Sequence, residues 1–262
     1  MRRSGLAKAL VTAASARERK RLLAAYPRLA DGRLADEIRK LCYASWTSKP
    51  TEAQRASIAA NSLLDCHPKP DVRANAEWVS GISNITKGKF DEAVDDLTRA
   101  RKLLRKLGRE LDAAQTLVPT ILALAILGRY DEAAKAGRSA LLVFTKAGDD
   151  LAAGKIEMNL CNIAARRSRH REAEKRGLRA LDLFIKAGER SWQAMAENNL
   201  ANIYMVLIDF RQARDFYARA LATARAAKML VTEAEIEASM GNLATLRGEY
   251  AEALRLLELS RR

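Results

Sequence analysis

Hydrophobic and small residues return along the chain in positions that repeat every 40 residues. The clearest case is a six-residue segment that ends on alanine: GKFDEA (88–93), GRYDEA (128–133), SRHREA (168–173), IDFRQA (208–213) and GEYAEA (248–253). A second column ends on glycine at Gly108, Gly148 and Gly188, and a third consists of Ala100, Ala140, Ala180 and Ala220. Three columns with one spacing define an internal repeat.

Each repeat predicts two helices. The first ends at the Gly-x-aromatic turn, where glycine adopts the left-handed backbone that a helix terminus needs. The second begins directly afterwards, with acids such as Asp91 and Glu92 next to its positive N-terminal dipole. The alanines at 93, 133, 173, 213 and 253 are expected where the two helices cross, because they let the backbones approach closely. Pro119 interrupts the first helix of the second repeat and predicts a kink.

These columns resemble the tetratricopeptide (TPR) repeat. The matching positions are the small residue at 81, 161, 201 and 241, the aromatic residue nine positions on, and the alanines twelve and nineteen positions on. Ile121 departs from the pattern, as does the missing proline at the end of each repeat. The resemblance implies an all-α fold, a right-handed α-solenoid of helix-turn-helix repeats. The period exceeds the usual 34 residues, and we expect the extra length in the second helices, near 90–107, 130–147, 170–187 and 210–227.

The period also sets the expected domain organisation. Residues 71–262 form five repeats that start near 71, 111, 151, 191 and 231, and residues 1–70 form an N-terminal helical cap with a degenerate repeat over 31–70. The last second helix starts at Tyr250 and ends about five residues short of its counterparts. Because ALRLLEL (253–259) keeps an apolar stripe, we expect a longer protein, or self-association through this end. Such long-period arrays resemble the N-terminal TPR arrays of bacterial proteins with a CHAT protease domain, and the helical arms of some large transcriptional regulators.

Composition predicts a soluble, cytoplasmic protein with no membrane segment. The net charge is +14, and residues 1–70 hold 14 basic and 6 acidic side chains, whereas the remainder hold 32 and 26. Three widely spaced cysteines without a CxxC pair fit a reducing compartment and argue against a zinc site or a disulfide framework. The opening MRRSGLAKALVTAASA has features of a signal peptide, but Lys8 interrupts its apolar part. Residues 113–127 are apolar but too short to span a bilayer.

The TPR resemblance implies that the first helices line a concave groove. Carried over position by position, the third to fifth repeats place a row of asparagines there, and asparagine amides can bind the backbone of an extended peptide. Lys155 and Arg166 add contacts to a carboxylate, and the first two repeats supply an apolar end through Trp78, Val79, Ile82, Val118, Leu122 and Ile126. The candidate peptide-binding residues are Asn159, Asn162, Asn198, Asn199, Asn202, Asn242, Lys155, Arg166, Met195 and Trp78.

Structural roles are the alternative for the same residues. The asparagines could hydrogen-bond to a neighbouring helix and lock one repeat against the next, and Trp78 could belong to the core. If the groove interpretation holds, alanine at Asn199 and Asn202 weakens partner binding and leaves thermal stability nearly unchanged. Equal losses of binding and stability favour the structural interpretation.

No enzyme is expected. The sequence has no glycine-rich phosphate loop, no metal-ligand spacing, no cofactor motif and no nucleophile–base pair. The expected partner is a protein or peptide, or a downstream domain of the same chain. The alternative is a nucleic acid or acidic partner bound by the basic runs RERKR (17–21), RARKLLRKLGR (99–109) and RRSRHREAEKR (166–176). That alternative predicts steeply salt-dependent association.

Overall fold

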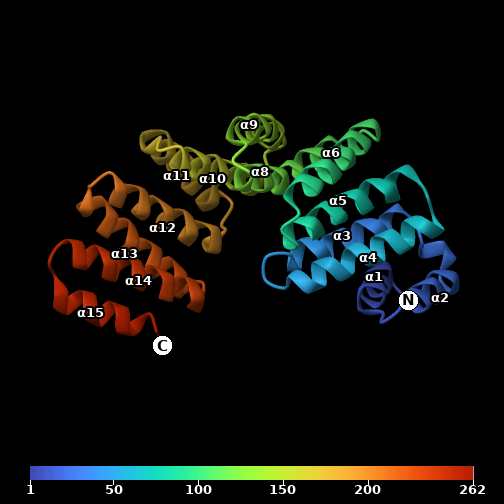
Figure 1. The fold of residues 1–262 in the computed structure, drawn as a ribbon, viewed down its shortest axis with the longest axis horizontal. Coiled ribbons are helices and arrows are strands. Elements are labelled where there is room, and N and C mark those ends of the chain that lie inside the picture. The colour runs from blue at the N-terminus through green and yellow to red at the C-terminus, as the bar shows by residue number, and fades with distance from the viewer. Residues whose placement is uncertain (262) are drawn as a thin grey trace. The chain divides into compact units, whose positions relative to one another are not determined.

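The chain forms helices joined by short turns. The structure, a computed structural model, describes residues 1–261, and within that range there is no β-strand. No helix in the same range is long and apolar enough to cross a membrane. The chain divides into two compact units, Met1–Val143 and the part from Phe144 onward, and the division falls inside a helix. The all-α fold of helix-turn-helix repeats is confirmed (Figure 1).

The first unit contains nine complete helices among its described residues: α1 (Arg3–Thr12), α2 (Ala16–Ala25), η1 (Pro27–Leu29), α3 (Gly32–Ser45), α4 (Pro50–Cys66), α5 (Pro70–Thr86), α6 (Phe90–Lys106), α7 (Glu110–Gln115) and α8 (Leu117–Ile126). α9 (Tyr130–Ala147) starts in this unit and ends in the next. Helices that follow one another in sequence pack together, as α4, α5 and α6 do. Trp78, Leu97 and Leu104 are fully buried in the resulting core.

The second unit continues with α10 (Asp150–Arg166), α11 (His170–Lys186), α12 (Arg190–Val206), α13 (Phe210–Ala226), α14 (Leu230–Leu246) and α15 (Tyr250–Leu259). Its core contains the buried Phe184, Leu200 and Tyr217. The second helices match their predicted ranges closely, but first and second helices are equally long: α10 to α14 each have 17 residues. Our expectation that the second helices alone carry the extra length is therefore wrong.

The turns follow one backbone design at intervals of 20 residues. Glycine with a positive φ occupies 88, 108, 128, 148, 188 and 248, and Ser168, Ile208 and Lys228 take the same left-handed conformation. At each turn the next N–H reaches back five residues, as Lys89 does to the Asn84 carbonyl at 2.9 Å. This bond satisfies a carbonyl that the helix end leaves free. The shared geometry explains why both helices of a hairpin have the same length.

Small residues set the distance between the two helices of a hairpin. The five alanines at 93, 133, 173, 213 and 253 are buried. A Cβ atom at Gly81 would lie 2.7 Å from the Leu97 side chain and 3.2 Å from the Ala93 carbonyl oxygen. Gly241 faces Leu257 and the Ala253 carbonyl oxygen in the same way. The predicted close crossing is confirmed.

Pro119 breaks its helix, as predicted. The helix stops at Gln115 and resumes at Leu117, so that α7 and α8 are separate. Proline has no N–H to donate to the carbonyl four residues earlier, which belongs to Gln115. The Tyr43 hydroxyl donates to that carbonyl instead, at 3.1 Å. A side chain from α3 thus replaces the missing backbone bond.

Replacing Ile208 with glycine is expected to stabilise the protein by about 1 kcal/mol, because a left-handed conformation costs a β-branched residue roughly 1–2 kcal/mol. The side chain is 74% exposed and little packing is lost. Thermal and urea unfolding measure the change. Gly248→Ala, at an equivalent turn, is the control and should destabilise. If Ile208→Gly does not raise the free energy of unfolding, the turn at Ile208 is not strained.

Candidate functional site

Asn199 links two neighbouring repeats. Its amide nitrogen, on α12, donates to Oδ1 of Asn162 at 3.2 Å and to the sulfur of Met158 at 3.0 Å, both on α10. The side chain therefore holds two first helices side by side. For this residue the structural role that we considered as the alternative is present.

Asn202 is tied to the second helix of its own hairpin. Its Oδ1 accepts a hydrogen bond of 2.6 Å from the Tyr217 hydroxyl on α13. Tyr217 is 1% exposed, and burial raises its pKa to about 12. The phenol therefore remains a protonated donor at neutral pH. This bond fixes the orientation of the Asn202 amide.

The same asparagines also line an opening. A pocket of about 200 Å³ is bounded by Asn162, Ala165, His170, Asn199, Asn202, Ile203 and Val206. Within the described residues, the amide nitrogens of Asn162 and Asn202 and Oδ1 of Asn199 make no side-chain hydrogen bond. Each amide thus uses one end in an internal hydrogen bond and leaves the other end without one at the pocket.

The other predicted asparagines are placed differently. Asn159 and Asn198 are half-buried, and Asn242 is exposed on α14. Oδ1 of Asn198 is buried and has no hydrogen-bond partner in the described part of the chain. A buried acceptor without a partner is costly. None of these three residues lines the pocket.

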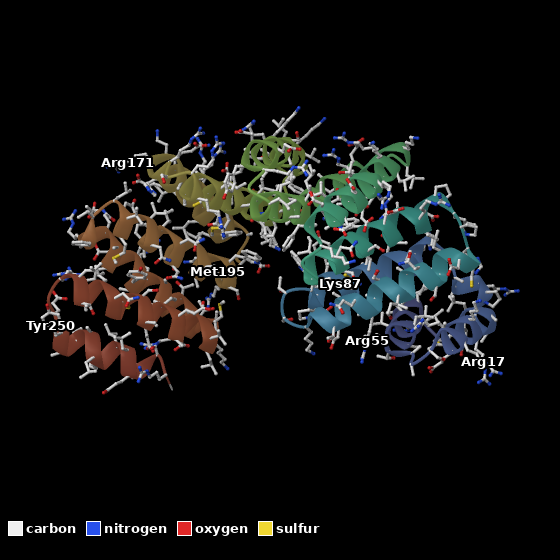
Figure 2. All side chains as sticks on the ribbon, viewed as in Figure 1. Arg17, Arg55, Lys87, Arg171, Met195 and Tyr250 are labelled. Atoms are coloured by element: carbon white, nitrogen blue, oxygen red, sulfur yellow. The ribbon has the colours of Figure 1, made fainter. Side chains whose placement is uncertain are left out.

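The candidates Lys155 and Arg166 lie on α10, and Met195 lies on α12. The Lys155 ammonium sits 4.8 Å from the centre of the Trp192 ring, and burial lowers its pKa. Arg166 is exposed near the end of α10. Met195 projects from α12 with 42% of its surface exposed (Figure 2). None of these three residues lines the pocket.

Trp78 belongs to the core. Its exposure is 0%, the Arg39 guanidinium lies 4.4 Å from the ring centre, and Tyr43 meets it edge-on at 5.7 Å. The indole offers no surface to a peptide, so our placement of Trp78 among the binding residues is not supported, and the core alternative describes it. Val79 and Ile82 are buried as well.

Our sequence reasoning missed a column of buried glutamates. Glu157, Glu197 and Glu237 are 3%, 1% and 7% exposed. Arg176 donates to Glu157 at 3.0 Å, Arg225 donates to Glu237 at 2.8 Å, and Glu197 accepts from Arg219 at 3.2 Å. Thr223 and Gln193 also bond to Glu197. These carboxylates join the two helices of a hairpin, or one hairpin to the next.

The missed column is visible in the sequence. Glutamate recurs at 77, 157, 197 and 237, and arginine follows 22 positions later at 99, 179 and 219. Arg99 donates to Glu77 at 3.0 Å, and Arg179 lies 3.9 Å from Glu157. In the second repeat both partners are replaced, by Leu117 and Ser139. The glutamate and the arginine are thus replaced together, as expected if the two side chains act as an ion pair.

Two of the three basic runs are partly neutralised by acids. In residues 99–109, Arg99 pairs with Glu77 and Asp96, Arg105 with Glu110, and Arg109 with Asp36 and Asp112. In residues 166–176, ion pairs join Arg169 to Glu172, Arg171 to Glu174 and Arg176 to Glu157. Paired guanidinium groups have less to offer a phosphate backbone. In the run 17–21, Arg19 donates to the Ala13 carbonyl at 2.8 Å.

Comparison with known proteins identifies the fold. No family profile matches the chain, and no curated protein matches its sequence. Among solved structures, a STAND signal-transduction ATPase with a TPR sensor from Pyrococcus horikoshii is similar with a TM-score of 0.75 and 16% identity, over 97% of this chain and 38% of that one. BtubC from P. vanneervenii is similar with a TM-score of 0.68 and 20% identity, over 83% of this chain and 90% of that one. NprR in complex with its cognate peptide NprX is similar with a TM-score of 0.59 and 14% identity, over 80% of this chain and 61% of that one.

These similarities confirm that the chain is a TPR-like helical repeat protein. At such low identity they establish the fold and leave the function to the residues of this chain. The resemblance to the arrays of CHAT proteins is not tested by them and stays a prediction.

Alanine at Asn199 or Asn202 is now expected to lower the free energy of unfolding by about 1 kcal/mol each, because each substitution removes an internal hydrogen bond. This revises our expectation of unchanged stability. Asn242→Ala, on the exposed face of α14, is the matched control and should change stability by less than about 0.5 kcal/mol. Equal melting temperatures for all three variants would show that the bonds of Asn199 and Asn202 contribute nothing.

Arg219→Met is expected to cost about 2 kcal/mol, because it leaves the buried Glu197 carboxylate without its cation. The double variant Glu197→Leu/Arg219→Met should recover most of that loss, since the second repeat has an uncharged pair at these positions. Urea unfolding of both single variants and the double variant forms a double-mutant cycle. Additive losses would argue against a coupled pair.

Proposed function

We propose that the chain is a non-catalytic interaction scaffold that binds an extended peptide segment across α10 and α12. The observation that carries this proposal is the pocket where Asn162, Asn199 and Asn202 converge with unused amide groups. Amide donors and acceptors match the N–H and C=O groups of a peptide backbone and require little of its sequence. This chemistry suits a binding module rather than an enzyme.

Exposed apolar side chains beside the amides supply the second component of recognition. Val206 lines the pocket and is 58% exposed, while Met195 on α12 and Leu246 on α14 are 42% and 65% exposed. Flexible methionine adapts to different ligand shapes. A peptide that places one hydrophobic residue against Val206 and its backbone against the asparagines would satisfy both surfaces.

Two structural neighbours support a regulatory setting. NprR was solved with its cognate peptide, and the STAND protein is described as having a TPR sensor. We infer the same class of role here: a sensor arm whose peptide ligand is a separate molecule or a downstream domain of the same chain. The free cysteines Cys42, Cys66 and Cys161 agree with a cytoplasmic location.

Filling the pocket is expected to abolish peptide binding. Ala165→Phe places a ring between the asparagines and should weaken selected peptides at least tenfold, because the ring occupies the space of the ligand. Peptides are first selected from a random phage-displayed library on the full chain, and their affinities for the wild type and the variant are then measured by fluorescence anisotropy.

Ala218→Phe is the matched control, because Ala218 is exposed on α13 and does not line the pocket. It should bind the selected peptides as the wild type does. The proposal is refuted if no peptide is selected, or if both variants bind equally well.

A further inference from the structure

A second pocket lies in the first compact unit. It has a volume of about 390 Å³, and three helix faces form it: positions 94, 97, 98, 101 and 105 of α6, positions 117, 120 and 124 of α8, and positions 132, 135, 136 and 139 of α9. Spacings of three and four residues place each set on one side of its helix. The floor is apolar, since Leu97, Leu117 and Leu124 are buried.

The pocket coincides with the departures of the second repeat from the others. Leu117 and Ser139 stand where the first, third and fourth repeats have a glutamate–arginine pair, so no ion pair bridges α8 and α9 here. Thr120 takes the place of Leu160, Leu200 and Met240 in the third to fifth repeats, while the first repeat has Ser80. Shorter side chains at 120 and 139 leave the volume that larger ones occupy elsewhere.

Arg101 places a charge in the pocket at a position where the second, third and fourth repeats have leucine. Arg101 occupies the column of Leu141, Leu181 and Leu221. Arg105 lies one helical turn further along the same face of α6. Burial, together with this neighbouring cation, lowers the pKa of Arg101. Neither Arg101 nor Lys135 forms an ion pair within the described residues, and Glu132, an acid in the lining, is bound by Arg129 at 2.7 Å.

We propose that this pocket binds a small amphiphilic carboxylate, with the apolar chain against Leu97, Leu117 and Leu124 and the carboxylate between Arg101 and Lys135. Such an anion supplies the negative charge that the second repeat lacks, and it relieves the repulsion between Arg101 and Arg105. The hydroxyl of Thr98 lines the same pocket and can donate to the carboxylate, whereas the Ser139 hydroxyl already donates to the Lys135 carbonyl at 3.1 Å. Small-molecule sites combine an apolar wall with convergent polar groups, and here three buried leucines face a lining that is otherwise mostly polar or charged.

Octanoate, octanol and octylamine are suitable probes, since they share one chain and differ in charge. Isothermal titration calorimetry on the full chain should show binding of octanoate and at least tenfold weaker binding of octanol and octylamine. Arg101→Leu installs the residue of the second to fourth repeats, so it should fold normally, and it should weaken octanoate binding about tenfold. Lys102→Leu, on the same helix but outside the pocket lining, should leave octanoate affinity unchanged.

Two-dimensional NMR of the methyl groups locates the ligand. Octanoate should shift the resonances of Thr120 and Leu124 and leave those of residues beyond 144 in place. The proposal is overturned if octanoate does not bind, if the three probes bind equally, or if Arg101→Leu and Lys102→Leu have the same effect. Equal binding of the probes would mean an apolar slot without charge selection.

Discussion

The close approach of two helices within each hairpin is the constraint on which the rest of the structure depends. At Gly81 and Gly241 a single added carbon would collide with a leucine of the partner helix, and alanine faces each glycine. Because the backbones lie this close, each hairpin is a rigid unit that exposes one face of its first helix. Stacking of hairpins then brings Asn162 and Asn199 into hydrogen-bond distance. The candidate site follows from hairpin packing.

Much of the fold could be predicted because its causes are local and periodic. The turn glycines, the crossing alanines and the break at Pro119 each act within a few residues of their own position. The buried glutamates recur in the sequence, but we did not predict their burial, because glutamate normally indicates a solvated face and their arginine partners Arg176, Arg219 and Arg225 come from other helices. Trp78 illustrates the same limit: its burial depends on Arg39 and Tyr43 in the preceding repeat.

The site was predictable in position but not in detail. The repeat register placed Asn199 and Asn202 on the first helices, and the pocket between α10 and α12 is bounded by both. The repeat register does not identify the hydrogen-bond partners of these two amides, because Tyr217 and Met158 come close to them only after the helices pack. An amide that bonds inward with one end and stays open at the other is held in a fixed orientation. Preorganised groups of this kind bind at a lower entropic cost.

The non-glycine turns have a consequence for how the array responds to a ligand. Ser168, Ile208 and Lys228 all lie in the second compact unit, and each holds its backbone in a conformation that glycine would adopt without strain. Each hairpin in this unit therefore contributes less to the total folding free energy than an unstrained hairpin would. In a linear array, each hairpin unfolds locally according to its own stability and that of its neighbours. An occupant bridging α10 and α12 would shift this local opening equilibrium and suppress fraying toward α15. Ligand binding at α10 and α12 would then increase the order of the hairpins toward α15 without changing their average structure.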